Sequence, residues 1–487
     1  MKQKVITGLK ILLKTAVAAA LFLVTWLELT PYFRVDRNTD GDLFRNLDPD
    51  SIDVLALGSS HMQYAFNPAV LYQETGYYGY VLGSSCQPFS TSYYLLEEAL
   101  KTQHPSVVLI DVFTLLPGSQ VCYADGMYYK AIDMMSGKTR IEAGKHATDT
   151  LSSDLQLAYT YDFILNHDHW KDMDFSDPES ILQNAEPAEG IHWDLGYVRQ
   201  MPTVFQYTPV QYLEPDNPIA LSEEEKQWID KLIDLCKENE IHLIFLKTPY
   251  DMSQTDSNKL CSIWAYLEEK GADYIDYVRK AADQEIDWYL HMDGDTWHNN
   301  AWGAEIVTSD LGKYLVENQL VTNHQDNELF RSVADGAVRS TAESLMNTTN
   351  LNVYTLISDS RIYPSTVLLR YRKEGSGLTD SLALSYLEKL GLNTDFSSDY
   401  YAVIQDGKVL SEGTEPFDYE LNGHTISFSE DDITIDGTSG YGTGTMCLTF
   451  AADDFSWINP IPISYDQHSF WKDGCDSWSC TVTSDQN

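Results

Sequence analysis

Serine, histidine and aspartate side chains stand at two places where this sequence could carry out nucleophilic chemistry. Gly58-Ser59-Ser60-His61 follows directly on the apolar stretch SIDVLAL, and Asp295 and His298 lie three residues apart much later in the chain. A serine hydroxyl becomes a nucleophile when a histidine takes its proton and a carboxylate holds that histidine in the right tautomer. All three residue types are present, in the chain order Ser, Asp, His.

The elements expected around these residues would bring them to one edge of a sheet. Apolar strands are expected at 51–58, 79–83, 104–113, 241–249 and about 273–277. Helices are expected between and after them, at 67–76, 91–103, 222–236, 257–271 and 301–317. This alternation indicates a three-layer α/β fold with a mainly parallel sheet and helices on both faces. Ligands bind at the carboxyl ends of the strands in such sheets, which is where both motifs fall.

Either motif alone is weak evidence. A strand followed by glycine and serine is often only a tight turn, and Asp-x-x-His arises readily by chance in an acidic chain. Their joint placement after the first and the last strand favours a nucleophilic site. His61 is next to Ser60, but adjacent side chains on an extended segment point apart. We therefore expect His61 to be a polar loop residue rather than a second base.

The motifs resemble those of the SGNH (GDSL-type) hydrolase superfamily. They are more similar to its membrane-anchored branch, which includes the D-alanyl-transfer protein of Gram-positive cell walls and the alginate O-acetylation proteins. The first block of the family, usually Gly-Asp-Ser, matches 58–60 and implies Ser60, not Ser59, as nucleophile. The last block implies Asp295 and His298 as its partners. The second block implies that the amide of Gly83 binds the oxyanion together with the amide of Ser60.

The sequence departs from the family at the third block, where an asparagine usually completes the oxyanion hole. Here the stretch reads VLIDVFTLLPG and contains no asparagine. Either Asp111 or a backbone amide of this loop replaces it, or the hole has only two donors. Losing one donor typically costs about 3 kcal/mol of transition-state stabilisation.

The resemblance, over about residues 50–320, implies a serine esterase or acyltransferase that acts on O-acyl groups, such as acetyl, of a cell-surface polysaccharide. The resemblance also implies a membrane-bound O-acyltransferase as a partner. It implies no cofactor. A non-catalytic glycan-binding or cell-envelope assembly factor on a degenerate scaffold of this kind is the alternative. His167 and His169 alternate as metal ligands do, but no third ligand is obvious, so we expect no metal site.

Residues from about 118 to 220 interrupt the regular pattern as a long insertion. Similar family members carry a His-x-x-Trp and a Gly-Tyr in this region, which implies a cap over the crevice. Substrate contacts are expected from this cap and from the loop that follows the second strand, namely from Trp170, Trp193, Tyr197, Arg199 and Gln87.

The two ends of the chain are expected to differ from the α/β region. Residues 1–30 carry four lysines before an apolar run at 15–27. This pattern favours an uncleaved signal anchor over a removed signal peptide, and we expect the rest of the chain on the extracellular face of the membrane. Residues 321–487 are expected to form a mostly-β domain after the catalytic region 31–320. Its turn signals are Asp406-Gly407 and Asn422-Gly423 in two hairpins, and a further strand pair is expected within 432–450.

Charge and cysteine content restrict the partners and the compartment. The 487 residues carry a formal net charge of −41, so the protein would repel nucleic acids. The seven cysteines are an odd number, so at least one stays free or pairs between chains. Cys475 and Cys480 could close a small loop near the end.

Overall fold

A computed structural model describes most of the 487 residues. The described residues are 2–33, 40–122, 125–146, 157–159, 161–185, 194–199, 212–283, 285, 298–332, 357, 360, 365–375, 377–379, 384, 387–388, 390–392, 396–465 and 470–472.

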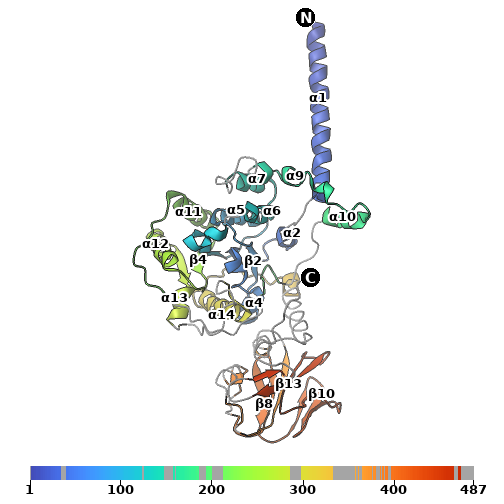
Figure 1. Ribbon diagram of the computed structural model, residues 1–487, viewed down its shortest axis with the longest axis vertical. Helices are drawn as coiled ribbons and strands as arrows, with labels where there is room; N and C mark the ends of the chain where they lie inside the picture. The colour runs from blue at the N-terminus through green and yellow to red at the C-terminus, as the bar shows by residue number, and fades with distance from the viewer. Residues whose placement is uncertain are drawn as a thin grey trace.

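A five-stranded parallel sheet forms the centre of the N-terminal domain (Figure 1). Its strands are β1 (Val54–Gly58), β2 (Gly79–Gly83), β3 (Val107–Asp111), β4 (His242–Lys247) and β5 (Asp273–Asp276). They lie in the order β2-β1-β3-β4-β5. The direction of strand progression reverses between β1 and β3, and ligands of such sheets bind beside the carboxyl ends of the strands at this point.

Helices cover both faces of this sheet. One face packs against α5 (Phe89–Ala99), α11 (Glu223–Glu238) and α12 (Gln254–Lys270). The other packs against α4 (Pro68–Thr75), α13 (Tyr277–Ala282) and α14 (Ala301–Glu317). Along β1, Leu55 and Leu57 belong to the first core, whereas Val54 and Ala56 belong to the second. Apolar runs of this kind suit parallel strands that are buried on both faces, so the predicted α/β fold is confirmed.

Local sequence signals set several of the helix ends. The side chain of Asn67 accepts a hydrogen bond from the amide of Ala69, Pro68 is the first residue of α4, and Gly76 ends the helix with a left-handed φ of 77°. Ser222 and Glu225 form a reciprocal capping box at the start of α11. These caps agree with the helix starts predicted at 67 and 222.

The insertion is built of short helices. A short helix, η2 (Phe113–Leu115), precedes it. The helices described within it are η3 (Pro117–Cys122), α6 (Asp125–Asp133), α7 (Gly137–His146), α9 (Asp162–Asn166), η4 (His169–Lys171) and α10 (Pro178–Ala185).

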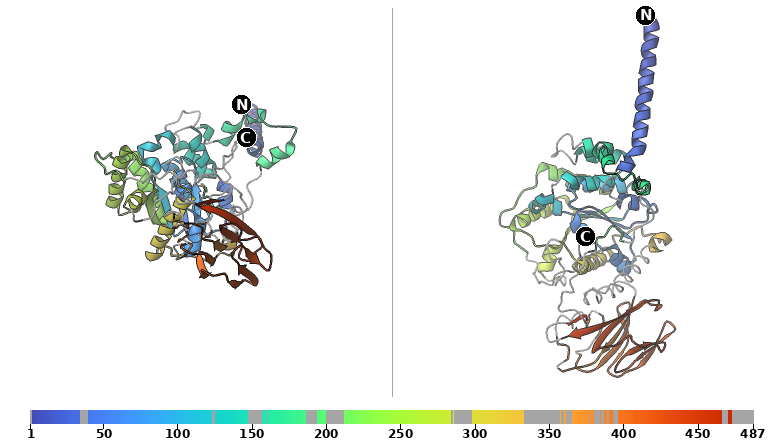
Figure 2. Two further views of the ribbon diagram at one scale, coloured as in Figure 1. Left: turned by 60° about the horizontal axis from the view of Figure 1, so that its bottom comes forward. Right: turned by 45° about the vertical axis from the view of Figure 1, so that its right-hand side comes forward.

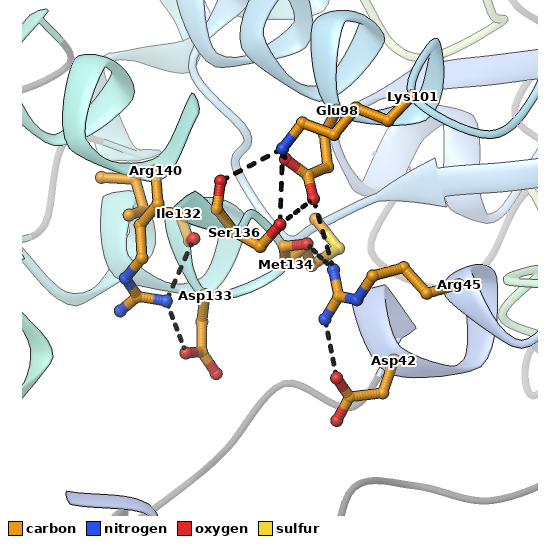
Figure 3. Close-up of polar contacts among 9 residues, drawn as sticks. All are labelled: Asp42, Arg45, Glu98, Lys101, Ile132, Asp133, Met134, Ser136 and Arg140. Carbon is orange, nitrogen blue, oxygen red and sulfur yellow. Dashed lines mark hydrogen bonds and ion pairs between the residues drawn. The ribbon is translucent and has the colours of Figure 1, made fainter. Parts of the chain in front are cut away.

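A polar network ties α6 and α7 to the body of the domain (Figure 3). Arg45, the last residue of α2 (Asp40–Arg45), donates to the carbonyl of Met134 at 2.8 Å and lies 3.6 Å from Glu98 of α5. The buried carboxylate of Glu98 also accepts from Ser136 Oγ at 2.6 Å and pairs with Lys101. The start of the domain is thereby fastened to the insertion.

The C-terminal domain consists of two packed antiparallel sheets (Figure 2). The larger contains β6 (Thr366–Tyr371), β7 (Tyr400–Gln405), β8 (Lys408–Gly413), β12 (Met446–Ala451), β13 (Ile458–Tyr465) and β14 (Phe470–Lys472). The smaller contains β9 (Asp418–Leu421), β10 (His424–Phe428) and β11 (Ile433–Ile435). A shared core that includes Leu368, Val403, Ile426 and Ile433 fills the space between them.

Both predicted hairpins are present in this domain. Asp406 and Gly407 join β7 to β8, and Asn422 and Gly423 join β9 to β10, with positive φ at all four residues. Two-residue turns with this conformation match the twist of antiparallel strands. The strand pair predicted within 432–450 is wrong, because β11 pairs with β10 whereas β12 pairs with β6 and β13.

The N-terminal segment is a long helix that projects from the body (Figures 1 and 2). It comprises α1 (Lys2–Leu29) and the short η1 (Thr30–Phe33). Within it, the 26 residues Thr7–Tyr32 are long and apolar enough to cross a membrane, and a signal sequence near the N-terminus shares these properties. Either an anchor or a signal sequence fits this end of the chain.

The residues just after α14 pack on the α/β domain. His324 pairs with Asp53 at 2.8 Å, and the ring of Phe330 stacks on Tyr78 at 4.6 Å. Among the described cysteines, Cys86 is disulfide-bonded and Cys236, Cys261 and Cys447 are free thiols. Cys475 and Cys480 lie outside the described residues.

Candidate active site

The backbone at the end of β1 turns sharply into a short helix, α3 (Ser60–Gln63). Gly58 has a φ of +154°, and a Cβ added there would lie 3.0 Å from the Cβ of Asp111 and 3.1 Å from that of Met62. Glycine is therefore required at this position. Ser59 caps α3 by accepting from the amide of His61 at 3.3 Å, which leaves Ser60 as the first helical residue.

Ser60 and His298 meet at this edge of the sheet although 238 residues separate them. Ser60 Oγ lies 2.9 Å from His298 Nε2, and the ring of Tyr64 lies 4.8 Å from the His298 ring. His298 precedes α14, whose first turn is capped where Asn300 Oδ1 accepts from the amide of Gly303 at 3.1 Å. A serine hydroxyl and an imidazole nitrogen at this distance can exchange a proton. Asp295 lies outside the described residues.

A second polar array, of Asp111, Lys247 and His61, lies buried beside this pair. Lys247 Nζ is 3.2 Å from His61 Nδ1, 3.6 Å from Asp111 Oδ2 and 3.0 Å from the carbonyl of Thr248. The side chains of Lys247 and Asp111 are completely buried. The His61 ring stacks on Phe113 at 3.7 Å and lies 5.3 Å from the His298 ring.

Burial and the neighbouring ammonium group fix the protonation of His61. Burial is the main cause that lowers the pKa of His61 well below its usual range, and the charge of Lys247 lowers it further. His61 is therefore neutral at physiological pH. A charged ammonium group can only donate, so a hydrogen bond from Lys247 to Nδ1 requires the tautomer with the ring proton on Nε2. Burial also lowers the pKa of Lys247, whereas the nearby Asp111 carboxylate raises it.

The sequence reasoning missed this array. The prediction that His61 is a polar loop residue is wrong, because His61 belongs to α3 and is only 2% exposed. The sequence carries only a partial signal, because Asp111 and Lys247 each directly follow an apolar run of four residues, 107–110 and 243–246. The sequence does not show that β3 and β4 are neighbours, with Asp111 opposite Leu246 in the register.

The structure places the residues expected around the oxyanion as follows. Gly83 is opposite Gly58 in the register of β1 and β2, and a Cβ at Gly83 would lie 2.7 Å from the carbonyl oxygen of Gly58. The close approach alone requires glycine there. Asp111 accepts from the amide of Phe113 at 2.9 Å and pairs with Lys247. An ionised carboxylate has no hydrogen to donate, so Asp111 does not replace the missing asparagine in that state.

The expected substrate contacts fall in different environments. Gln87 is fully buried and donates to Ser92 Oγ at 2.9 Å, so it braces the loop after β2. Tyr197 and Arg199 lie in a segment next to α3, where the amide of Val198 donates to the carbonyl of Gln63 at 2.9 Å. Trp170 lies in η4 and is half exposed. Trp193 lies outside the described residues.

Asn299, the residue after His298, was not anticipated as a site residue. It is 2% exposed, and neither its Oδ1 nor its Nδ2 has a hydrogen-bond partner among the described residues. A buried carboxamide without partners is costly, and such groups often serve a ligand. Within the described part of the chain, no group of three or more His, Cys, Asp or Glu side chains could hold a metal ion.

Comparison with known proteins adds little to this geometry. No family model matches the sequence, and no curated protein matches it. A solved structure of a "putative acylhydrolase" from Bacteroides fragilis is 12% identical, with a TM-score of 0.28, over 59% of this chain and 98% of its own. This similarity is too low to support a conclusion about activity. The fold and the contacts define the class as a doubly wound α/β protein with a serine–histidine pair at the carboxyl edge of its sheet.

Proposed function

We propose that this protein is an exported serine acyltransferase or esterase that acts on O-acyl groups, such as acetyl, of a cell-surface polysaccharide. The observation that carries the proposal is the 2.9 Å contact between Ser60 Oγ and His298 Nε2 at the carboxyl edge of the sheet. The resemblance to the SGNH superfamily supports the acyl chemistry. The membrane-anchored branch of that family supports the polysaccharide substrate and a membrane-bound O-acyltransferase as the source of acyl groups.

The reaction would proceed through an acyl-serine. Ser60 Oγ attacks the ester carbonyl while its proton passes to His298 Nε2, and the carbonyl oxygen becomes an oxyanion. The amides of Ser60 and Gly83 would stabilise this charge. The amide of Ser60 is in the first turn of α3, where helical hydrogen bonds leave amides unused. The tetrahedral intermediate collapses, and His298 returns the proton to the departing alcohol.

A second attack completes the transfer. Water or a sugar hydroxyl gives its proton to His298 and attacks the acyl-serine, which restores Ser60 and releases an acid or a new ester. Asp295 would accept a hydrogen bond from Nδ1 of His298 and hold the tautomer that presents Nε2 to Ser60. His298 is the base assigned to Ser60, because its Nε2 lies 2.9 Å from Ser60 Oγ, whereas Nδ1 of His61 is bonded to Lys247.

A serine-directed phosphonate tests this proposal on the full chain. Intact-mass analysis should show one adduct on the wild type, none on Ser60→Ala and a strongly reduced rate on His298→Ala. Ser59→Ala is the matched control, because the Ser59 hydroxyl caps α3 at 3.3 Å from the His61 amide and should not be the nucleophile. The same variants are then assayed with p-nitrophenyl acetate. Equal loss of activity in Ser59→Ala and Ser60→Ala would contradict the assignment of Ser60.

The alternative function is a non-catalytic glycan-binding or envelope-assembly factor. It is favoured by the pairing of Asp111 with Lys247. This pairing leaves Asp111 unable to replace the asparagine that donates to the oxyanion in most members of the family. That alternative predicts no phosphonate adduct on the wild type and unchanged glycan binding in Ser60→Ala.

A further inference from the structure

A set of large apolar side chains is exposed along one short part of the insertion. Phe175 is 67% exposed, Leu182 55% and Trp170 51%, and Leu157 and Tyr161 are exposed to a similar degree. Isolated exposed apolar residues are common on proteins, but several within one segment mark an interaction surface. We call these five residues the apolar patch.

The segment that carries the patch is packed on its inner side. Tyr159 is 3% exposed and its ring lies 5.7 Å from that of Tyr129, and Asn166 is 1% exposed. Leu165 packs against the main core of the α/β domain. The outward apolar side chains therefore belong to a segment that is already fastened to the body.

The patch lies beside the end of the apolar helix. Both α9 and α10 contact η1, which directly follows α1 and ends one residue after the apolar stretch Thr7–Tyr32. Figures 1 and 2 show α9 and α10 at the base of α1 from two directions. The helix that carries Leu182, and the helix that lies between Tyr161 and Trp170 in the chain, thus lie next to the point where the chain would leave a bilayer.

The link between the end of the apolar helix and the α/β domain is short. Seven residue steps join Phe33 to Asp40, the first residue of α2, and an extended chain spans at most about 3.5 Å per residue, or about 25 Å here. Beyond it, Arg45 fastens α2 to Met134 and Glu98 (Figure 3). A Cβ at Gly41 would lie 2.5 Å from the carbonyl oxygen of Met134, so the packing there is tight.

We propose that the apolar patch docks into the outer surface of the membrane that α1 spans. Tryptophan, tyrosine, phenylalanine and leucine are the side chains that enter the interface between headgroups and acyl chains. The residues between them include Asp168, Asp172 and Asp177, so an anionic surface is disfavoured and the occupant is a bilayer of neutral headgroups. The proposal rests on the expectation from the sequence that residues 1–30 are an uncleaved membrane anchor, and it is independent of the acyl transfer.

Photo-crosslinking to lipid tests this docking with the full-length chain. The protein is reconstituted in phosphatidylcholine nanodiscs that contain a phosphatidylcholine with a diazirine in its acyl chain. After irradiation, peptide mass spectrometry should find lipid adducts on α1 and on peptides that contain Trp170, Phe175 and Leu182. Peptides with Leu329 and Leu410, which are 46% and 40% exposed, are matched controls and should remain at background.

A variant then isolates the patch. Trp170→Ser, Phe175→Ser and Leu182→Ser together should reduce adducts on 157–185 at least tenfold and leave those on α1 unchanged. The urea denaturation transition of the variant, compared with that of the wild type, verifies that it is folded. Ser60→Ala should keep the lipid adducts, which separates this test from the proposed function. Adducts on α1 with none on the patch would overturn the docking. Crosslinks from the patch to another protein chain, or a mature protein that lacks α1, would do the same.

Discussion

Two polar clusters lie side by side at the same sheet edge and differ in almost every physical respect. Ser60 Oγ lies 2.9 Å from His298 Nε2, and the histidine is only partly buried. Asp111, Lys247 and His61 form an array in which Asp111 and Lys247 are completely buried and His61 nearly so. The two histidine rings are 5.3 Å apart.

The difference shows how one residue type can be given two tasks by its surroundings. A base that takes up and returns a proton in each cycle needs access to its substrate and a partner with a transferable proton. A buried histidine bonded to an ammonium group is instead held in one neutral tautomer. We interpret the Ser60–His298 pair as reactive and the buried array as the support that fixes α3 and its serine. The following predictions test this division.

The largest effect on stability is expected where the buried array is broken. Lys247→Met leaves Asp111 buried without its partner, so the free energy of unfolding should fall by about 3–5 kcal/mol. Adding Asp111→Asn should recover much of this loss, because the second variant removes the unpaired charge. Urea denaturation monitored by tryptophan fluorescence measures both.

The exposed pair of Lys270 and Asp230 is the matched control for this prediction. Its atoms are closer, at 2.8 Å, than the 3.6 Å between Lys247 and Asp111, but both side chains are about one-third exposed. Lys270→Met should therefore leave stability close to that of the wild type. Similar losses in Lys247→Met and Lys270→Met would show that burial does not set the energy of the array.

The next largest effect concerns the turn that joins the two clusters. Gly58→Ala forces a side chain into a φ of +154° and against Asp111, which should cost about 1–3 kcal/mol of stability. Because Ser60 follows two residues later, phosphonate labelling should slow sharply as well. Gly76→Ala, at a φ of +77° with open space around the added Cβ, should lose about 1 kcal/mol and keep normal labelling. Normal phosphonate labelling of Gly58→Ala would show that the conformation of this turn does not control the reactivity of Ser60.

Much of the architecture could be predicted from local patterns in the sequence. The apolar run that becomes β1, the cap and terminal glycine of α4, and the two-residue turns at 406–407 and 422–423 each depend on residues close in the chain. The strand order and the partners of β11 and β12 could not be predicted, since they depend on contacts between distant segments. The sequence shows that a strand exists but not which strand lies beside it.

The candidate site divides in the same way. The Asp-x-x-His motif and the Gly-Ser-Ser turn pointed to Ser60 and His298, and their meeting followed from the rule on parallel strand ends. The buried array escaped because its members are common residue types, with no motif spacing, on β3, β4 and α3. Asp111 and Lys247 meet beside His61 because β1, β3 and β4 are neighbouring strands, which no local pattern in the sequence indicates.

A smaller effect is expected from the pH dependence of stability. Burial holds the pKa of His61 well below its usual value, near 6.5, in the folded state. Below about pH 6.5 the unfolded chain therefore binds a proton that the folded site rejects, and stability falls as the pH falls. The slope is at most about 1.4 kcal/mol per pH unit from this one group.

Denaturation of wild type and His61→Gln between pH 5 and 7.5 measures that contribution. The wild type should lose about 1–2 kcal/mol more than the variant between pH 6.5 and 5. Asp111 works in the opposite direction, because burial raises its pKa and the folded state then binds the extra proton, but it is present in both proteins. Parallel pH curves for the two proteins would mean that His61 titrates in the folded state as it does in the unfolded chain.

The smallest effect compares two adjacent asparagines that follow His298. Asn300 caps α14 through the amide of Gly303, so Asn300→Leu should lower the free energy of unfolding by about 1 kcal/mol. Asn299 is equally buried but its carboxamide has no hydrogen-bond partner within the described structure, so Asn299→Leu should raise stability by about 1 kcal/mol. Thermal denaturation of the two variants shows whether the signs are opposite.

The activity of the same two variants gives the sharper result. A costly buried group beside a reactive histidine is retained when it binds something that the free protein lacks. Asn299→Leu should therefore slow p-nitrophenyl acetate hydrolysis although it stabilises the fold, whereas any loss in Asn300→Leu should follow its stability. If Asn299→Leu is both more stable and fully active, the Asn299 carboxamide has no part in the reaction.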